Sequence, residues 1–278
     1  MKVGFIGIGK MGRPMSLRLA GQGHDVIAYD ALPGAASGLK GVAEGTLTDV
    51  ADCPVVITML PNGGIVRSVA DQIAPMMAEG AVLIDMSSSY PFETLDLRKA
   101  LPDTIHLIDA PVSGGVWRAE IGTLTIISGG DAAALDRVEP MLEAMGKITR
   151  TGALGSGHAM KLMNNYLSAA GLAAACEAVS VGKAFGLDPD VMADVFNGST
   201  GKNNATEVKL KQHINSEAYA TGFSMGLMAK DLALGRKLTE DLGMTAAGWV
   251  AMQELFARGV EAFGPESDHT EIAKLLKG

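Results

Sequence analysis

Residues 3–30, VGFIGIGKMGRPMSLRLAGQGHDVIAYD, decide the fold class of this chain. The apolar run Val3–Ile6 predicts a buried strand, and Met11–Gln22 has the length and pattern of a helix. A second strand is predicted over Asp25–Tyr29. The glycines before the helix indicate a tight turn. A strand, a glycine turn, a helix and a second strand in this order predict the first βαβ unit of a parallel sheet.

The same alternation continues through the first half of the chain. Four further strands are predicted, most of them as continuous apolar runs typical of strands buried on both faces: Val55–Met59, Ala81–Asp85, His106–Asp109 and Leu124–Ile127. A helix is predicted over Ile65–Met77. We therefore expect an α/β domain with a doubly wound parallel sheet over residues 1–157.

The second half has a different pattern. Residues 158–185 are rich in Ala and Leu and contain no proline, which predicts one long helix. Asp188-Pro189 then resembles an N-cap followed by proline at the first helical position. Further helices are predicted over Met225–Leu242, Thr245–Phe263 and Thr270–Lys277. The glycine-rich residues 152–157 suit a hinge, so residues 158–278 are expected to form an all-α domain joined by the long helix.

Composition excludes several classes of partner. Of the 278 residues, 47% are hydrophobic, which is enough for a full core, and the net charge of −8 argues against a nucleic acid partner. No apolar run has the length needed to span a bilayer, and the chain begins directly with a strand rather than a leader. Cys53 and Cys176 lie far apart, and the five histidines show no ligand spacing. We expect a cytoplasmic protein without a metal site.

The glycine turn carries a cofactor signal. Gly7-Ile8-Gly9-Lys10-Met11-Gly12 is a G-x-G-x-x-G that follows a predicted strand and opens a predicted helix. These glycines allow a tight turn, a close approach of the backbone to a pyrophosphate, and close helix–strand packing. Asp30 follows at the end of the second strand, where its carboxylate can bind both ribose hydroxyls and repel a 2′-phosphate. With no arginine next to Asp30, NAD is favoured over NADP.

Two more loops are expected at the cofactor. Ligands of such folds bind at the carboxyl ends of the strands. Met59-Leu60-Pro61 follows one predicted strand and Ser87-Ser88-Ser89 follows the next. The serine hydroxyls can bond a ribose or the nicotinamide amide, although serines are also ordinary turn and capping residues.

Two segments suggest how a substrate is bound and converted. Ser113, Gly114 and Gly115 can offer a hydroxyl and successive N–H groups to a carboxylate, although a plain glycine turn has the same sequence. Lys161 and Asn165 have i, i+4 spacing, which places both on one face of the long helix. Apolar neighbours desolvate such a lysine and make it a usable acid or base near neutral pH, which hydride transfer from an alcohol requires. A snorkelling surface lysine is the alternative.

The segments taken together resemble the β-hydroxyacid dehydrogenase family, which includes 3-hydroxyisobutyrate dehydrogenases and tartronate, succinic semialdehyde and glyoxylate reductases. The resemblance covers essentially the whole chain. Its motifs are GFIGIGKMG at 4–12, DAPVSGG at 109–115, GTLTIISGG at 122–130, GHAMKLMNN at 157–165 and KDLALG at 230–235.

The resemblance implies an NAD-binding Rossmann domain followed by a helical domain that binds substrate and forms dimers or tetramers. It implies that Lys161 is the catalytic acid/base, assisted by Asn165, and that Ser113, Gly114 and Gly115 bind the substrate carboxylate. Ser88, where the family usually has threonine, would contact the cofactor. From the helical domain, Lys230 would contact cofactor or substrate, and Phe223 and Asp231 are expected beside the cofactor. Asp268 also fits the family's C-terminal pattern.

One position departs from the family. Trp117-Arg118 follows the Ser-Gly-Gly segment where small or aliphatic residues are more usual. Our hypothesis is that Arg118 or Trp117 adapts the substrate pocket to a second anionic or bulkier group; the alternative is an Arg118 that points to solvent.

These motifs are compatible with more than one activity. The leading expectation is an NAD-dependent dehydrogenase that interconverts a short 3-hydroxy acid and its semialdehyde or oxo acid. An NADPH-dependent semialdehyde or glyoxylate reductase is the alternative. An imine reductase and a non-catalytic dinucleotide-binding module are disfavoured, because relatives of both kinds usually lack a lysine at the position of Lys161.

Overall fold

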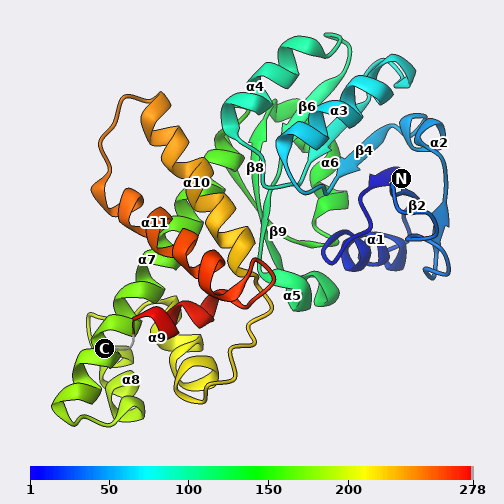
Figure 1. The fold of residues 1–278 in the computed structure, drawn as a ribbon. Coiled ribbons are helices and arrows are strands. Elements are labelled where there is room, and N and C mark those ends of the chain that lie inside the picture. The colour runs from blue at the N-terminus through cyan, green and yellow to red at the C-terminus, as the bar shows by residue number, and fades with distance from the viewer. Residues whose placement is uncertain (277–278) are drawn as a thin grey trace. The chain divides into compact units, whose positions relative to one another are not determined.

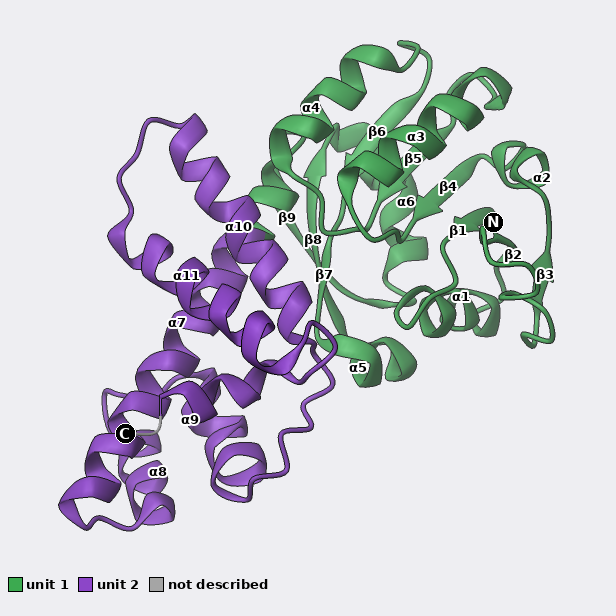
Figure 2. Ribbon diagram, viewed as in Figure 1, with its two compact units in different colours: residues 1–161 green, residues 162–278 purple. Residues whose placement is uncertain are grey.

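The computed structural model describes residues 1–276 and divides into two compact units, Met1–Lys161 and Leu162–Gly278 (Figure 2). The division falls near the start of helix α7 (Ser156–Phe185), and the predicted boundary at residues 157 and 158 falls in the same helix. Lys277, at the end of the last predicted helix, lies outside the described residues. No helix of the described chain is long and apolar enough to cross a membrane.

Unit 1 is built on one sheet of nine strands (Figure 1). Its strand order is β3-β2-β1-β4-β5-β6-β8-β7, and β9 also pairs with β8. The strands are β1 (Lys2–Ile6), β2 (Asp25–Tyr29), β3 (Val42–Glu44), β4 (Val55–Thr58), β5 (Val82–Asp85), β6 (His106–Asp109), β7 (Val112–Ser113), β8 (Leu124–Gly130) and β9 (Gly146–Gly152). The first six pair in parallel in the order 3-2-1-4-5-6, which is the doubly wound order of dinucleotide-binding domains.

Helices cover both faces of this sheet. They are α1 (Gly12–Gly21), α2 (Leu47–Ala51), α3 (Gly63–Ile73), the 3-10 helix η1 (Ala74–Met76), α4 (Pro91–Ala100), α5 (Gly115–Ile121) and α6 (Ala132–Leu142). Successive side chains of a strand point to opposite faces. Phe5 of β1 therefore packs in one core with Leu19 of α1, and Ile6 packs in another with Val66 of α3. Two separate cores are the physical basis of the doubly wound fold predicted from the buried strands.

The described part of unit 2 is helical. After α7 come α8 (Pro189–Asn197), α9 (Asn204–Val208), the π-helix η2 (Leu210–Asn215), α10 (Met225–Asp241), α11 (Ala247–Phe263) and the 3-10 helix η3 (His269–Leu275). As predicted, Asp188 caps α8, accepting from the N–H groups of Asp190 and Val191. The unit has its own core, in which Leu172 of α7, Leu232 of α10 and Phe256 of α11 are fully buried.

The structure differs from the predicted elements at short or irregular segments. The strands β3, β7 and β9 were not predicted; β3 and β7 have two or three residues, and most of β9 is exposed, so none shows a continuous apolar run. The predicted helix over Ile65–Met77 ends earlier, because Pro75 lacks an N–H and the chain continues as η1. The last predicted helix is the 3-10 helix η3.

Candidate active site

The glycine turn between β1 and α1 has the geometry that the motif predicts. A Cβ on Gly12 would lie 1.8 Å from the carbonyl oxygen of Gly7, so only glycine allows this approach of helix to turn. By contrast, a Cβ on Gly9 would meet no atom within 4 Å, so protein packing does not require glycine there. No side chain caps α1; the Arg13 N–H donates to the carbonyl oxygen of Gly9 at 3.0 Å, and Pro14 has no N–H to offer. These features fit a dinucleotide pyrophosphate at this turn.

Asp30 lies directly against this turn. Its carboxylate accepts hydrogen bonds from the N–H of Ile8, at 2.6 Å, and from the N–H of Leu32, at 2.8 Å. The sequence did not indicate the contact with Ile8. Because the Ile8 N–H donates to Asp30, it stabilises the turn. Asp30 is half-buried, and each of its oxygens retains a lone pair for a further donor such as a ribose hydroxyl. In the same turn, Lys10 is exposed and Met11 is half-buried.

The two loops expected at the cofactor are joined to each other. The hydroxyl of Ser87 accepts a hydrogen bond from the N–H of Leu60 at 2.9 Å, so the Met59–Pro61 loop and the serine loop form one edge. Asp85, the last residue of β5, stabilises that edge: its carboxylate accepts hydrogen bonds from the hydroxyls of Thr58, at 3.0 Å, and Ser89, at 2.6 Å. The structure thus brings these loops together, while the contact of Ser88 with a cofactor stays a prediction.

The Ser-Gly-Gly segment lies where β7 meets α5. Ser113 is half-buried, and Gly114 and Gly115 have φ values of 138° and 72°, a left-handed backbone that favours glycine. The aliphatic stem of Arg118 lies over Gly114, since a Cβ on Gly114 would lie 2.6 Å from the Arg118 Cδ. Among the described residues of unit 1, no carboxylate pairs with the exposed Arg118 guanidinium. Trp117 is 66% exposed.

The first turn of α7 is anchored on the sheet of unit 1. A Cβ on Gly157 would lie 2.3 Å from the carbonyl oxygen of Ile127, so this glycine permits the helix to start against β8. The Asp109 carboxylate accepts from the N–H groups of Gly155, at 2.7 Å, and His158, at 2.8 Å. Lys161 follows one turn later and is buried. The anchoring fixes the helix that carries Lys161.

Unit 2 contains a second group of predicted site residues. The Asn165 amide donates a 2.6 Å hydrogen bond to Asp231, and Lys230 Nζ lies 3.6 Å from the other oxygen of the same carboxylate. Asp231 is 2% exposed, so Lys230-Asp231 is not the ordinary exposed ion pair that the local sequence suggests. Phe223 lies apart from these contacts, edge-on to the ring of His269 at 5.5 Å.

A buried charged cluster near Phe223 was not predicted, apart from the family resemblance of Asp268. Burial alone would raise the pKa of Asp268, but hydrogen bonds from His269, Thr270 and Thr221 outweigh it and hold that pKa well below its usual range. Burial also lowers the pKa of Lys209 to about 8, an effect that Asp268 only partly offsets. Thr221 and Lys209 lie far from Asp268 in sequence, and only the tertiary fold brings them to it.

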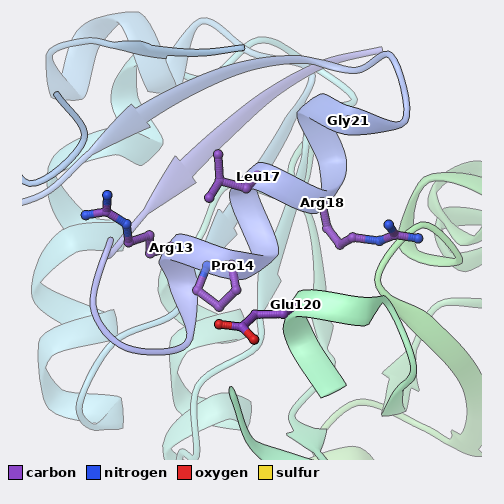
Figure 3. Close-up of a pocket in the computed structure, with 6 residues that line it drawn as sticks. All are labelled: Arg13, Pro14, Leu17, Arg18, Gly21 and Glu120. Atoms are coloured by element: carbon purple, nitrogen blue, oxygen red, sulfur yellow. The ribbon is translucent and has the colours of Figure 1, made fainter. Parts of the chain in front are cut away.

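A hollow of about 340 Å³ lies elsewhere on unit 1, between α1 and α5 (Figure 3). Arg13 and Arg18 on its wall point in opposite directions, and Glu120 approaches Pro14 from α5. None of the predicted site residues lines it, so we do not assign the active site to this hollow. Among the described residues, no group of three or more His, Cys, Asp or Glu side chains could hold a metal ion.

The strand order, the glycine turn and Asp30 define unit 1 as a dinucleotide-binding domain. Comparison with known families agrees. The NAD binding domain of 6-phosphogluconate dehydrogenase matches residues 2–155, and the NAD-binding domain of NADP-dependent 3-hydroxyisobutyrate dehydrogenase matches residues 155–276. The chain belongs to the β-hydroxyacid dehydrogenase family, and it is an NAD(P)-dependent oxidoreductase that acts on CH–OH groups.

Individual relatives cover most of the chain. A 2-(hydroxymethyl)glutarate dehydrogenase of Eubacterium barkeri is 38% identical, over 88% of this chain and 86% of the relative. A 3-hydroxyisobutyrate dehydrogenase of Pseudomonas aeruginosa is 34% identical, over 99% and 98%. The solved structure of a Mycobacterium tuberculosis 3-hydroxyisobutyrate dehydrogenase with L-serine has a TM-score of 0.92 at 32% identity and covers 100% of this chain and 99% of that one.

Proposed function

We propose that this enzyme oxidises a short 3-hydroxy acid to its semialdehyde or oxo acid, or reduces the latter, with Lys161 as general acid/base. The observation that carries the proposal is the anchored first turn of α7, because it fixes a helix with Lys161 and Asn165 on one face. In oxidation, Lys161 Nζ takes the hydroxyl proton of the substrate, and in reduction it returns that proton to the carbonyl oxygen. Asn165, held by Asp231, orients the reacting group.

The substrate carboxylate is proposed to bind at Ser113, Gly114 and Gly115. Their hydroxyl and N–H groups supply donors without a charged side chain, and the left-handed glycines form the concave backbone that suits an anion. Lys230 is proposed to contact cofactor or substrate from unit 2, with Phe223 and Asp231 beside the cofactor.

The cofactor is proposed to be NAD. When bound, the nicotinamide ring accepts or donates the hydride. The chain would hold it with the Gly7–Gly12 turn, with Asp30 on the adenosine ribose, and with the Met59–Pro61 loop and Ser88 nearer the reacting end. Asp30 supports NAD over NADP, since a carboxylate against the turn repels a 2′-phosphate.

A substrate panel tests this proposal. Initial rates would be measured with 3-hydroxyisobutyrate, glycerate, threonate, 3-hydroxypropionate and L-serine, each with NAD and with NADP, and with tartronate and succinic semialdehydes in reverse. We expect kcat/KM to be at least about tenfold higher with NAD for the best acid. A preference for NADP would overturn the role given to Asp30, and no turnover of any acid or semialdehyde would overturn the proposed function.

Arg118 supports a finer proposal, that the preferred substrate carries a second anionic group. Its guanidinium extends from a stem lying on Gly114, next to the site proposed for the first carboxylate. The Eubacterium barkeri relative is named for 2-(hydroxymethyl)glutarate, a dicarboxylate. Arginine can bind a carboxylate through two parallel hydrogen bonds.

Kinetics of Arg118→Met on matched substrates test this role. We expect kcat/KM for 2-(hydroxymethyl)glutarate to fall about 10- to 100-fold, while that for 3-hydroxyisobutyrate changes less than about threefold, because only the dicarboxylate uses the guanidinium. Arg118→Lys is the matched control that keeps the charge. Unchanged selectivity between the two acids in Arg118→Met would rule the role out.

Two further features concern the state of the enzyme in the cell. We propose a homodimer or homotetramer assembled through the helical unit. An apolar stripe along α7, with side chains three or four residues apart, supports self-association: Met163, Leu167, Ala170, Ala174, Ala178, Val181 and Phe185.

We also propose a cytoplasmic location, which the free thiols of Cys53 and Cys176 support.

A further inference from the structure

His158 occupies a buried position that the proposed chemistry does not use. It lies in the first turn of α7, three residues before Lys161, and is 1% exposed. Its ring is bonded on both sides: Nδ1 lies 2.8 Å from the Thr94 hydroxyl of α4, and Nε2 lies 3.1 Å from the backbone carbonyl of Ser87. All three residues belong to unit 1.

The hydrogen-bond partners define which nitrogen of the neutral His158 ring carries the hydrogen. A backbone carbonyl can only accept, so Nε2 carries the hydrogen and donates it to Ser87. Nδ1 then accepts, at 2.8 Å, from the Thr94 hydroxyl, which also lies 3.3 Å from the carbonyl oxygen of Tyr90. The charged groups nearest the ring are two buried carboxylates, Asp85 at 3.6 Å from Nε2 and Asp109 at 3.9 Å from Nδ1. Neither carboxylate is within hydrogen-bond distance of the ring.

The bond to Ser87 reaches both cofactor loops. The Ser87 hydroxyl accepts from the N–H of Leu60, which fixes the Met59–Pro61 loop. Ser88 lies between two anchored residues, since the Ser87 carbonyl is held by His158 and the Ser89 hydroxyl donates to Asp85 at 2.6 Å. A displacement of Ser87 would therefore move Ser88, the proposed cofactor contact, together with the Met59–Pro61 loop.

The backbone of His158 is tied to the same sheet edge. Its N–H donates to Asp109, and Asp109 of β6 is the register partner of Asp85 of β5. The two carboxylates lie side by side at the carboxyl ends of paired parallel strands. Asp109 accepts hydrogen bonds from the start of α7, and Asp85 accepts one from the serine loop. The His158 ring connects the start of α7 to the serine loop.

We propose that His158 is a positioning residue that keeps the cofactor loops in register with the helix that carries Lys161. This inference rests on the proposed function of Lys161. Hydride transfer requires the nicotinamide and the acid/base to reach the same substrate carbon and oxygen at once, so a small relative displacement lowers the rate steeply. The His158–Ser87 bond is a direct side-chain link between those two parts within unit 1.

Two amide variants separate the two ring nitrogens. The amide nitrogen of His158→Gln reaches about as far as Nε2 and can still donate to the Ser87 carbonyl. The shorter amide of His158→Asn reaches only the Nδ1 position and keeps a partner for Thr94. For His158→Asn, we expect the Kd for NADH to rise and kcat for the best 3-hydroxy acid to fall, each about tenfold. His158→Gln should restore both to within about threefold of wild type.

NADH binding would be measured by fluorescence titration, turnover at saturating NAD, and folding by thermal unfolding of each variant. Thr94→Val, which removes the other ring partner, should shift Kd and kcat in the same direction as His158→Asn, and Thr94→Ser should restore them. A folded His158→Asn with wild-type Kd and kcat would overturn the proposal. Equal losses in His158→Gln and His158→Asn would also overturn it, because they would indicate loss of packing only.

The same data distinguish failure of this inference from failure of the proposed function. If the wild-type enzyme binds NADH but turns over no 3-hydroxy acid or semialdehyde, the proposed function is wrong. In that case unequal NADH affinities of the two His158 variants would still show the coupling to the cofactor loops, and equal affinities would reject it.

Discussion

At the scale of single residues, hydrogen bonds within the fold show which predicted site residues already have a protein partner. Asp231 appears in the sequence as half of an adjacent ion pair, yet it is buried and bonded to Asn165, 66 residues away in the chain. Ile8 lies in the predicted pyrophosphate turn, yet its N–H serves Asp30. Residue types at motif spacing therefore suggest candidate site residues, whereas the partners of each group follow from the fold.

Lys209 provides a prediction about stability. Its pKa is lowered from 10.5 to about 8 by burial, and its Nζ donates to Ser168 at 3.3 Å. Between these two pH values the unfolded chain binds the proton and the folded chain does not, so the free energy of unfolding should rise with pH over this range. The gain is at most about 3 kcal/mol.

Chemical denaturation between pH 7 and 10.5 checks this, with Lys209→Met as the reference. The difference in unfolding free energy between wild type and Lys209→Met should move in favour of wild type as the pH rises from about 8. A difference that is constant with pH would show that Lys209 keeps its ordinary pKa in the folded state.

At the scale of elements, burial distinguishes the strands that were predicted from the strands that were not. All six predicted strands form, because strands covered on both faces need continuous apolar runs. The strands β3, β7 and β9 lack such runs. The link from α7 through His158 to the serine loop joins residues 71 positions apart, and no local pattern signals it.

The apolar stripe on α7 yields a prediction about assembly. Val181 is 71% exposed, near the carboxyl end of the helix and remote in sequence from Lys161. If the stripe is a subunit interface, a buried charge there is costly, and Val181→Glu should raise the dissociation constant of the oligomer at least about 100-fold. Sedimentation equilibrium would measure this.

Lys183→Glu is the matched control, because Lys183 is an exposed polar residue on the same helix. We expect this variant to keep the wild-type mass. A wild-type enzyme that is monomeric, or a Val181→Glu variant with wild-type mass, would show that the stripe is not the interface.

At the scale of the whole molecule, the predicted site residues are divided between the two units. The sheet unit holds the predicted cofactor residues and the first turn of α7, and the helical unit holds the Asn165–Asp231–Lys230 group. The family and the order of units could be predicted because the motifs are local and occur in one order along the chain. The substrate could not, since its identity depends on a pocket built from distant residues.

Turnover by Lys161→Met with the best 3-hydroxy acid, measured alongside a titration with NADH, tests the proposed acid/base role of Lys161. We predict that kcat falls at least about 100-fold, as expected for loss of a general acid/base, while the Kd for NADH stays within about twofold of wild type. A folded Lys161→Met enzyme that binds NADH and turns over at nearly the wild-type rate would show that Lys161 is not the general acid/base.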